Sequence, residues 1–399
     1  MKTKLEVVII GAGPAGALTA YLLSLQGHKV RVFEKNNYPI KNKICGEYLC
    51  PAGDKLLADL NLQSLLINYP KIYGMNLYSP NQQHVSTHFP NAQYGHALKR
   101  EIFDNELIKL AQSKGAEFHF GVHIQSLQQK ENKILVTDGI KSWETSYVVG
   151  AEGRQSLVGK WLDLRKKSES KRVAIHTYLK VKPGVKYNQG EMHILSDGSY
   201  CGLNPVNDSF WNFSLVCDAG KIMKYKSTEK LVREAISESK RMREIFDLDS
   251  APWEPKISGK ITNPMKKLGS KTKQAVLVGD AAGFVDPLTG EGIYHALLTA
   301  KVFSQCMKNH ENFDLALDNY ETIIQKGYRK KEIVNYFFQW LIHRPILCNL
   351  IAHFLKSRPV VRNTFIGLIG NVYTPLESIK IIFFNIFNKK GIANYVDHY

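Results

Sequence analysis

Residues 5–27 read LEVVIIGAGPAGALTAYLLSLQG, and this stretch decides the fold. The first six residues are mostly apolar and β-branched, the pattern of a parallel strand buried on both faces. A glycine-rich turn follows, and then an apolar helix that ends at Gly27. Strand, turn and helix in this order predict the opening unit of a doubly wound α/β sheet, whose helix N-terminus faces an anionic ligand.

The turn itself provides the first candidate ligand-binding residues, which are Gly11, Gly13, Pro14, Ala15 and Gly16. Glycines here allow a tight turn, close approach of the backbone to a pyrophosphate, and close packing of helix on strand. A second strand over residues 29–33 ends at Glu34, which Lys35 follows. A carboxylate at that point accepts hydrogen bonds from both hydroxyls of an adenosine ribose. The segment therefore predicts a dinucleotide site, with FAD and NAD both open and a purely structural turn as the alternative.

A second glycine-rich segment follows another buried strand, residues 274–278 (QAVLV). It begins with Gly279 and Asp280, continues to Pro287, and opens the helix IYHALLTAKVFSQCM through Gly290 and Gly292. Two further segments lie between the glycine-rich ones, LKREIFDNEL at residues 98–107 and VVGAEGRQS at residues 148–156.

In order and spacing these four segments resemble the flavoprotein family of aromatic-ring hydroxylases such as p-hydroxybenzoate hydroxylase, ubiquinone-biosynthesis hydroxylases and geranylgeranyl reductases. The resemblance implies a Rossmann-like FAD-binding domain of this type, with FAD as cofactor and NAD(P)H as electron donor. It also implies that Asp280 holds a ribityl hydroxyl, that Arg100 contacts FAD, and that the helix start after Pro287 faces the flavin. Glu152 stands where the family has an aspartate, so its charge is kept but displaced by one methylene.

The segment around Cys45 and Gly46 narrows the resemblance. Lys43-Ile44-Cys45-Gly46 resembles the loop of geranylgeranyl reductases that lies beside the flavin and contacts flavin and substrate. A competing interpretation takes Cys45 and Cys50 as the redox disulfide of glutathione-reductase-like enzymes. That interpretation requires a second dinucleotide turn for NAD(P)H, which the sequence does not contain.

The expected substrate loop, residues 198–205, departs from the geranylgeranyl reductase pattern. It keeps Tyr200 and the final Pro205 but loses the tryptophan and phenylalanine between them. We therefore expect a monooxygenase that hydroxylates a small apolar aromatic or lipid-like substrate. Reduction of prenyl double bonds is the alternative, and a flavin-binding partner protein without turnover is the remote one. His96, His176 and His295 have no positioned partner in the sequence, so no catalytic base is assigned.

Composition limits the remaining classes. The 399 residues include 53 Lys and Arg against 36 Asp and Glu, a net charge of +17 that favours anionic partners. The basic residues are dispersed and no zinc module or RNA-binding signature occurs, so we expect no nucleic acid and no metal. Six scattered cysteines and the lack of a signal peptide predict a cytoplasmic protein without structural disulfides.

Three regions are expected. Residues 1–75, 95–170 and 257–330 form the discontinuous FAD-binding domain, and residues 76–94 and 171–256 form a substrate domain with an antiparallel β-sheet. Residues 331–399 form a C-terminal helical region, cut by prolines at positions 345, 359 and 375. Its basic, aromatic helices over residues 332–390 are either a peripheral contact with the inner face of the membrane, or a helical cap or dimer face. The oligomeric state stays open.

Overall fold

The computed structural model describes residues 5–41, 43–164, 171–259, 261, 267–284 and 286–386. Its first layer is a six-stranded sheet in the order β18-β19-β12-β1-β2-β8. The five strands from β19 to β8 run parallel, and β18 is an antiparallel edge. The strands are β1 (Glu6–Ile10), β2 (Lys29–Glu34), β8 (Glu117–Phe120), β12 (Tyr147–Gly150), β18 (Gly269–Ser270) and β19 (Ala275–Leu277).

The parallel strands end together at one edge of this sheet. Ile10 lies opposite Phe33 on one side and Gly150 on the other, and Gly150 lies opposite Leu277. Ligands of open α/β sheets bind beyond such carboxyl ends. The register thus brings the segments that follow these four strands to one place.

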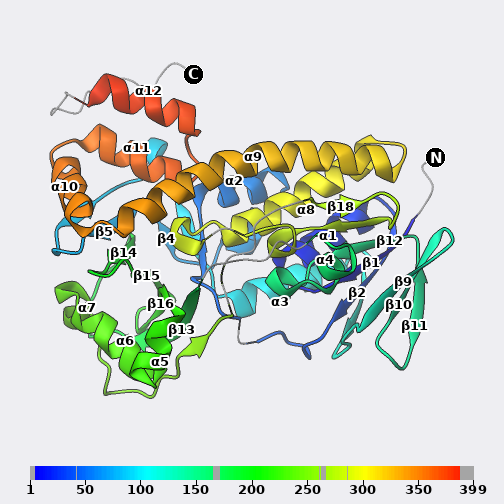
Figure 1. Ribbon diagram of the computed structural model, residues 1–399, viewed down its shortest axis with the longest axis horizontal. Helices are drawn as coiled ribbons and strands as arrows, with labels where there is room; N and C mark the ends of the chain where they lie inside the picture. Colours follow the sequence, from blue (N-terminus) through cyan, green and yellow to red (C-terminus); the bar gives the residue numbers. More distant parts are fainter. Residues whose placement is uncertain are drawn as a thin grey trace.

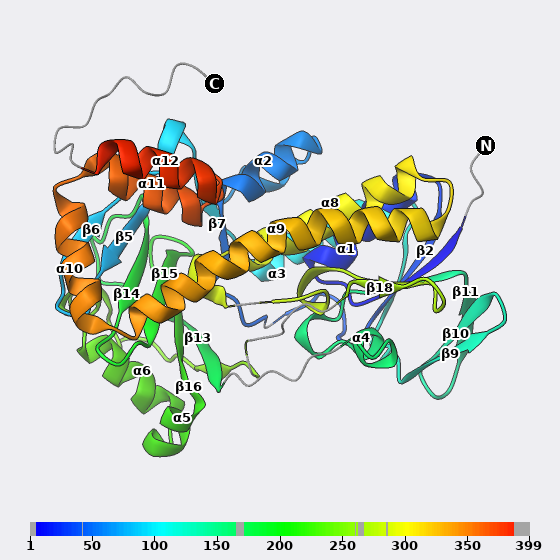
Figure 2. The same ribbon diagram turned by 45° about the horizontal axis from the view of Figure 1, so that its top comes forward.

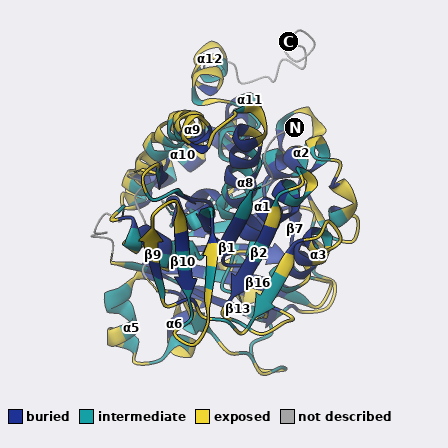
Figure 3. Ribbon diagram, turned by 90° about the vertical axis from the view of Figure 1, so that its right-hand side faces the viewer, coloured by how far each residue is buried: buried dark blue, intermediate teal, exposed yellow. Residues whose placement is uncertain are grey.

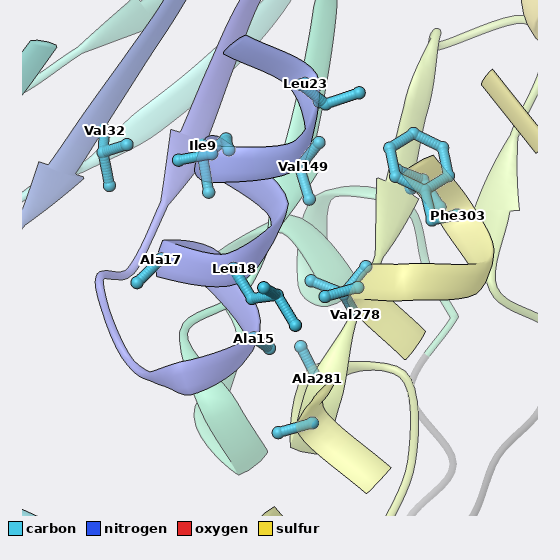
Figure 4. Close-up of a cluster of buried hydrophobic side chains, with 14 of the residues drawn as sticks. Ile9, Ala15, Ala17, Leu18, Leu23, Val32, Val149, Val278, Ala281 and Phe303 are labelled. Carbon is cyan, nitrogen blue, oxygen red and sulfur yellow. The ribbon is translucent and has the colours of Figure 1, made fainter. Parts of the chain in front are cut away.

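Apolar helices cover this sheet. In Figure 4, Leu18 of α1, Val149 of β12 and Phe303 of α8 belong to a single cluster of buried side chains. A hairpin unit of β9 (Ser126–Lys130), β10 (Lys133–Thr137) and β11 (Ser142–Thr145) adds Ile134 and Val136 to the same core. The helices involved are α1 (Pro14–Leu25), α3 (Arg100–Gln112), α4 (Leu157–Trp161) and α8 (Gly292–Asn309).

The second layer is a seven-stranded sheet in the order β17-β13-β16-β15-β14-β5-β6. Its strands β13 and β16 coincide with stretches of alternating sequence from which an antiparallel sheet is expected. One pair departs from the antiparallel expectation, because β14 pairs in parallel with β5, which comes from a much earlier part of the chain and is not joined to it by a hairpin. The strands are β5 (Met75–Tyr78), β6 (His84–Ser86), β13 (Arg172–Lys180), β14 (Gly190–Ile194), β15 (Tyr200–Pro205), β16 (Phe210–Asp218) and β17 (Lys256–Ile257).

Short elements complete the two layers. Helices α5 (Ala219–Tyr225), α6 (Thr228–Ser237) and α7 (Lys240–Ile245) share a hydrophobic core with the second sheet. A small sheet of β3 (Tyr48–Leu49), β7 (Gly95–Ala97) and β4 (Lys71–Ile72) lies with α2 (Pro51–Asp59).

Four helices form the C-terminal region, and the last three begin at the prolines that the sequence indicates as breaks. They are α9 (Phe313–Ile342), α10 (Pro345–Lys356), α11 (Pro359–Ile369) and α12 (Pro375–Asn385). Proline at the first helical position needs no hydrogen-bond partner and has the right φ, which explains these starts. Helix α9 crosses residue 330 without a break and runs from the first layer to the second (Figures 1 and 2). Among the described helices, none has the length and apolarity needed to cross a bilayer.

Candidate functional site

A cavity of about 860 Å³ is lined by both sheets and by the C-terminal helices. Of the fifteen residues predicted to bind the cofactor, fourteen line it. These are Gly11, Gly13, Pro14, Ala15, Glu34, Lys35, Cys45, Gly46, Arg100, Gly279, Asp280, Pro287, Gly290 and Gly292. Gly16 is the exception. A Cβ atom there would lie 2.0 Å from the Gly11 carbonyl oxygen, so Gly16 serves the packing of helix against turn.

The first glycine-rich turn is shaped by close backbone approaches. Gly11 has φ +100°, and a Cβ atom there would lie 2.4 Å from the carbonyl oxygen of Ala151. At Gly13, by contrast, a Cβ atom would meet nothing within 4 Å, so the backbone is open on that side. No side chain caps the first turn of α1, whose N–H groups are therefore available to an anion.

Glu34 fixes this turn from the end of β2. Its Oε2 accepts a hydrogen bond from the Ala12 backbone N–H at 3.0 Å, and its Oε1 accepts one from the Asn36 N–H at 2.9 Å. Oε1 also accepts a hydrogen bond from the Asn36 side-chain amide, whereas Oε2 can accept a second one. The carboxylate can thus hold the turn and still accept a hydroxyl donor at the cavity.

The second glycine-rich segment repeats the arrangement at α8. Gly279 and Asp280 lie in a 3₁₀ turn (Gly279–Ala281), and the first turn of α8 again has no side-chain cap. Burial raises the pKa of Asp280, and the charges of Arg154 and Arg100 oppose that rise. Two uncapped helix starts and two carboxylates thus surround one cavity.

This donor set fits FAD. The α1 turn would supply N–H groups for the pyrophosphate, and Glu34 would supply an acceptor for the adenosine ribose. Asp280 would supply acceptors for the ribityl chain, and the start of α8 would supply a partial positive charge for the flavin.

The Cys45 loop is held between the two layers. The side-chain amides of Asn212 and Asn204, both on the second sheet, donate to the carbonyl oxygens of Cys45 and Gly46 at 2.9 Å each. Burial raises the pKa of the Cys45 thiol, and burial raises that of Cys50 to about 12. Both are free thiols, as are the other four cysteines. The disulfide between Cys45 and Cys50 that the redox interpretation requires is therefore not formed in this structure.

Arg100 lies beside the Cys45 loop, at the start of α3. Its Nε and Nη2 donate to both carboxylate oxygens of the buried Asp104 at 2.7 Å each. The guanidinium is therefore fixed by a carboxylate of its own helix while it lines the cavity.

Glu47 is a cavity residue that the sequence analysis does not single out. Its Oε1 accepts from the Arg100 backbone N–H at 2.8 Å and from the Tyr178 hydroxyl at 2.9 Å. Its Oε2 accepts from the Asn212 amide at 3.1 Å. Burial raises the pKa of Glu47, and these three donors only partly offset that effect. Its position directly after Cys45-Gly46 was the available signal, whereas Tyr178 and Asn212 come from distant strands and gave none.

Glu152 lines the cavity, but its carboxylate is hydrogen-bonded to the residues that open α4. Its Oε1 accepts from the Val158 N–H at 3.0 Å, and its Oε2 accepts from the Ser156 hydroxyl at 2.8 Å. The longer side chain thus reaches back to the start of α4. The neighbouring Arg154 also lines the cavity, with its guanidinium 5.8 Å from the centre of the Phe284 ring.

Tyr200 is buried and bonded. Its hydroxyl donates to Asp286 Oδ1 at 2.5 Å, and Arg172 Nη1 lies 3.4 Å from Asp286 Oδ2. Asn335 of α9 also donates to the Asp286 carbonyl oxygen at 3.1 Å. Tyr200 therefore ties the second sheet to the segment before α8.

A large part of the remaining cavity lining is apolar, and most of it comes from the second layer and the C-terminal helices. The group comprises Met75, Leu77, Phe89, Met192, Ile194, Val216, Phe338, Leu341, Ile342, Phe365, Ile366 and Ile369. Phe338 of α9 and Phe365 of α11 pack edge to face, with ring centres 5.0 Å apart. A water-poor wall of this kind suits a hydrocarbon ligand.

The three histidines have structural surroundings. Burial lowers the pKa of His176 and of His295 to about 4, so both are neutral at pH 7. His176 Nε2 lies 2.8 Å from the Asn212 amide, and His96 Nδ1 lies 3.2 Å from Asp54. Among the described residues, no cluster of His, Cys, Asp and Glu could hold a metal ion.

Comparison with known proteins gives matches along most of the chain. A family model described as FAD binding domain matches residues 4–303. A digeranylgeranylglycerophospholipid reductase of Methanocella arvoryzae is 25% identical over 396 residues, covering 94% of this chain and 97% of the relative.

Two solved structures show the shared fold. A geranylgeranyl bacteriochlorophyll reductase-like protein of Thermoplasma acidophilum superposes with a TM-score of 0.75 at 18% identity, covering 95% of this chain and 98% of its own. PqsL of Pseudomonas aeruginosa, a probable FAD-dependent monooxygenase, superposes with a TM-score of 0.66 at 18% identity, covering 91% and 99%.

Proposed function

The chain belongs to the FAD binding domain family and is an FAD-dependent oxidoreductase, and on that premise we propose that it reduces carbon–carbon double bonds of a prenyl-type lipid. We further propose NAD(P)H as the electron donor. When bound and reduced, FAD supplies the hydride for such a reduction. The protein's own residues bind and orient the lipid, exclude water from the cavity and provide a proton.

The observation that carries this proposal is the composition of the cavity lining. One part of it consists of two uncapped helix starts and the carboxylates of Glu34 and Asp280, and another part consists of apolar side chains of α9 and α11. A long hydrocarbon chain fits the apolar wall, and its double bond can then lie toward the glycine-rich part. The relative from Methanocella arvoryzae is named for a lipid with such chains.

Glu47 supports reduction in particular. Saturating a double bond consumes one hydride and one proton, and the proton needs a donor inside a dry cavity. Burial raises the pKa of Glu47 above its ordinary value of 4.5, so this carboxyl retains a proton at higher pH than an exposed one. Tyr178 and Asn212 hold it in place at the cavity wall.

Basic side chains support the choice of donor. Lys35, Lys43, Arg154 and Lys160 line the same cavity as the glycine-rich turns. Their charge favours a nicotinamide dinucleotide, which carries phosphates.

Hydroxylation, the first expectation from the sequence, is the second candidate. The observation that favours it is the substrate loop. Tyr200 is engaged there by Asp286, and Gly202 and Asn204 stand where the reductase pattern has tryptophan and phenylalanine. The fold shared with PqsL is compatible with this reaction.

Anaerobic turnover separates the two reactions. The FAD-loaded protein, reduced with NAD(P)H without oxygen, is mixed with a geranylgeranyl glycerol ether lipid. We expect the flavin absorbance to return and the lipid to gain two hydrogen atoms per double bond, as seen by mass spectrometry. Oxygen-dependent turnover that places a labelled oxygen atom in the product would establish hydroxylation instead. A flavin that neither donor nor lipid alters would indicate a binding protein without turnover.

A further inference from the structure

The C-terminal helices expose an unusual number of large apolar side chains. On α9, Ile333, Tyr336, Phe337 and Trp340 follow one another at helical spacing, and each is about half exposed or more. We call the full set the C-terminal apolar surface. It consists of Ile333, Tyr336, Phe337, Trp340, Ile346, Leu350, Leu376, Ile379, Phe383 and Phe384, with exposed fractions from 47% to 80%.

This surface lies on helices that already have a buried apolar face. Phe338, Leu341 and Ile342 of α9 line the cavity on the side away from Ile333 and Trp340. On α12, Ser378 is buried next to the exposed Ile379. Core packing therefore explains one face of these helices and leaves the outer face without a partner among the described residues.

The helices that bear the surface gather at one end of the molecule. Figures 1 and 2 both place α10, α11, α12 and the C-terminal half of α9 there, and Figure 3 shows exposed segments along α9 and α12. Scattered exposed apolar side chains are ordinary, but ten large ones on neighbouring helices mark an interaction surface.

Charge selects the partner. Residues 329–386 contain eight Lys and Arg and only two carboxylates, Glu332 and Glu377. The guanidinium of Arg344 lies 4.1 Å from the centre of the Trp340 ring, so basic and apolar groups are interleaved. A second copy of this chain facing the surface would bring like charges together, whereas an anionic lipid surface brings opposite charges together.

We propose that the C-terminal apolar surface docks the protein onto an anionic lipid bilayer. The helices lie in the interface and do not span it, since no described helix is long and apolar enough to cross. Aromatic and aliphatic side chains enter the acyl boundary while the basic side chains contact lipid phosphates. Residues 387–390 of the membrane segment expected from the sequence lie outside the described residues. The proposal does not rest on the reaction carried out in the cavity.

Vesicle co-sedimentation of the full-length, FAD-loaded protein tests it. The vesicles are either phosphatidylglycerol with phosphatidylcholine in equal amounts, or phosphatidylcholine alone. We expect strong binding to the anionic vesicles and weak binding to the neutral ones. Raising the salt from about 0.1 M to about 1 M shortens the screening length from about 10 Å to about 3 Å, so binding falls.

Three variants locate the contact. F383S with F384S on α12, and Y336S with W340S on α9, each lower the partition coefficient by about tenfold, because apolar area is lost from the interface. K356E with K380E lowers binding to anionic vesicles only, and it tests the proposal even if a serine variant fails to fold. The matched control is I140S, since Ile140 is 91% exposed on the distant β10–β11 hairpin and its loss leaves binding unchanged.

Light scattering of the same samples tests whether a second copy of this chain, and not a bilayer, covers the C-terminal apolar surface. A concentration-dependent dimer that these substitutions dissociate would make the surface an interface between copies and overturn the proposal. Wild-type protein that stays in the supernatant with anionic vesicles at low salt would also overturn it. So would surface variants that bind as tightly as I140S.

Discussion

The glycine-rich part and the apolar part of the cavity lining, called here its two ends, are built in different ways. The glycine-rich end consists of two short segments, each a strand, a turn and a helix start, in which the ligand-facing groups are neighbours in sequence. The apolar end consists of side chains from β5, β14, β16, α9 and α11, which are far apart along the chain. The difference shows that backbone chemistry for an anionic cofactor is encoded locally, while a hydrocarbon wall is encoded only by the tertiary fold.

Gly16→Ala should have the largest effect on the glycine-rich end. The new Cβ atom would lie 2.0 Å from the Gly11 carbonyl oxygen, so the turn must move. Its N–H groups then no longer point at the pyrophosphate. Two lost charge-assisted hydrogen bonds correspond to about 4 kcal/mol, or about a thousandfold weaker FAD binding. Fluorescence titration of apoprotein with FAD measures this.

Gly13→Ala is its matched control. A Cβ atom at Gly13 meets no protein atom within 4 Å, so thermal unfolding of the apoprotein should change by no more than about 0.5 kcal/mol. FAD affinity should nevertheless fall, because the methyl group occupies the space open to the pyrophosphate. Unchanged FAD affinity in this variant would show that the turn does not approach the cofactor.

Glu47→Gln tests whether this cavity residue provides the proton for lipid reduction. We expect kcat for lipid reduction to fall by about 100-fold, the lower end of what a general acid contributes. In the wild type, activity should decline as pH rises through the raised pKa of Glu47, and the variant should lack that decline. A pH profile that keeps its shape in the variant would assign the proton to another group.

The same carboxyl predicts a stability effect with a definite sign. Because the folded state raises the pKa of Glu47, its protonated form is favoured, and stability is lost as pH rises above 4.5 through the folded value. The unfolding free energy of Glu47→Gln should lack this decline, which urea denaturation at several pH values measures.

Phe365→Ala perturbs the apolar end alone. The ring lines the cavity and packs on Phe338, so its loss should raise the KM for lipid by about tenfold, equivalent to about 1.4 kcal/mol. FAD affinity should stay within about twofold of wild type, because no contact of the glycine-rich turns is removed. A parallel loss of FAD would mean that the two ends do not function separately.

How far the sequence predicts this site follows from the same contrast. Fourteen predicted residues line the cavity. Those of the first glycine-rich turn and Glu34 follow from the order of strand, turn and helix, whereas residues such as Cys45, Arg100 and Asp280 follow only from the resemblance to the flavoprotein family. Gly16 could not be separated from the other residues of that turn, since packing and ligand contact impose the same need for glycine. Glu47, Tyr178 and Asn212 meet only through the second sheet, and periodicity carries no information on that meeting. The sequence predicts the helix breaks at the C-terminal prolines. It does not predict which face of each helix lies over the cavity.

Glu152→Asp should have the smallest effect. The shorter side chain can no longer reach both the Val158 N–H and the Ser156 hydroxyl, which costs about 1 kcal/mol of unfolding free energy. FAD affinity should remain close to wild type, since Glu152 uses its carboxylate at the start of α4. A marked change in FAD affinity would show that the Glu152 carboxylate takes part in FAD binding.

The most direct measurement of the central claim is a flavin difference spectrum recorded while a prenyl lipid is added to the FAD-loaded protein without oxygen. One cavity that holds the cofactor at its glycine-rich end and the lipid at its apolar end predicts a saturable change in flavin absorbance. The same titration with Phe365→Trp, which fills the apolar end, should keep the flavin and lose the change. A protein that takes up no FAD, or that binds lipid while the flavin spectrum stays constant, would contradict the account.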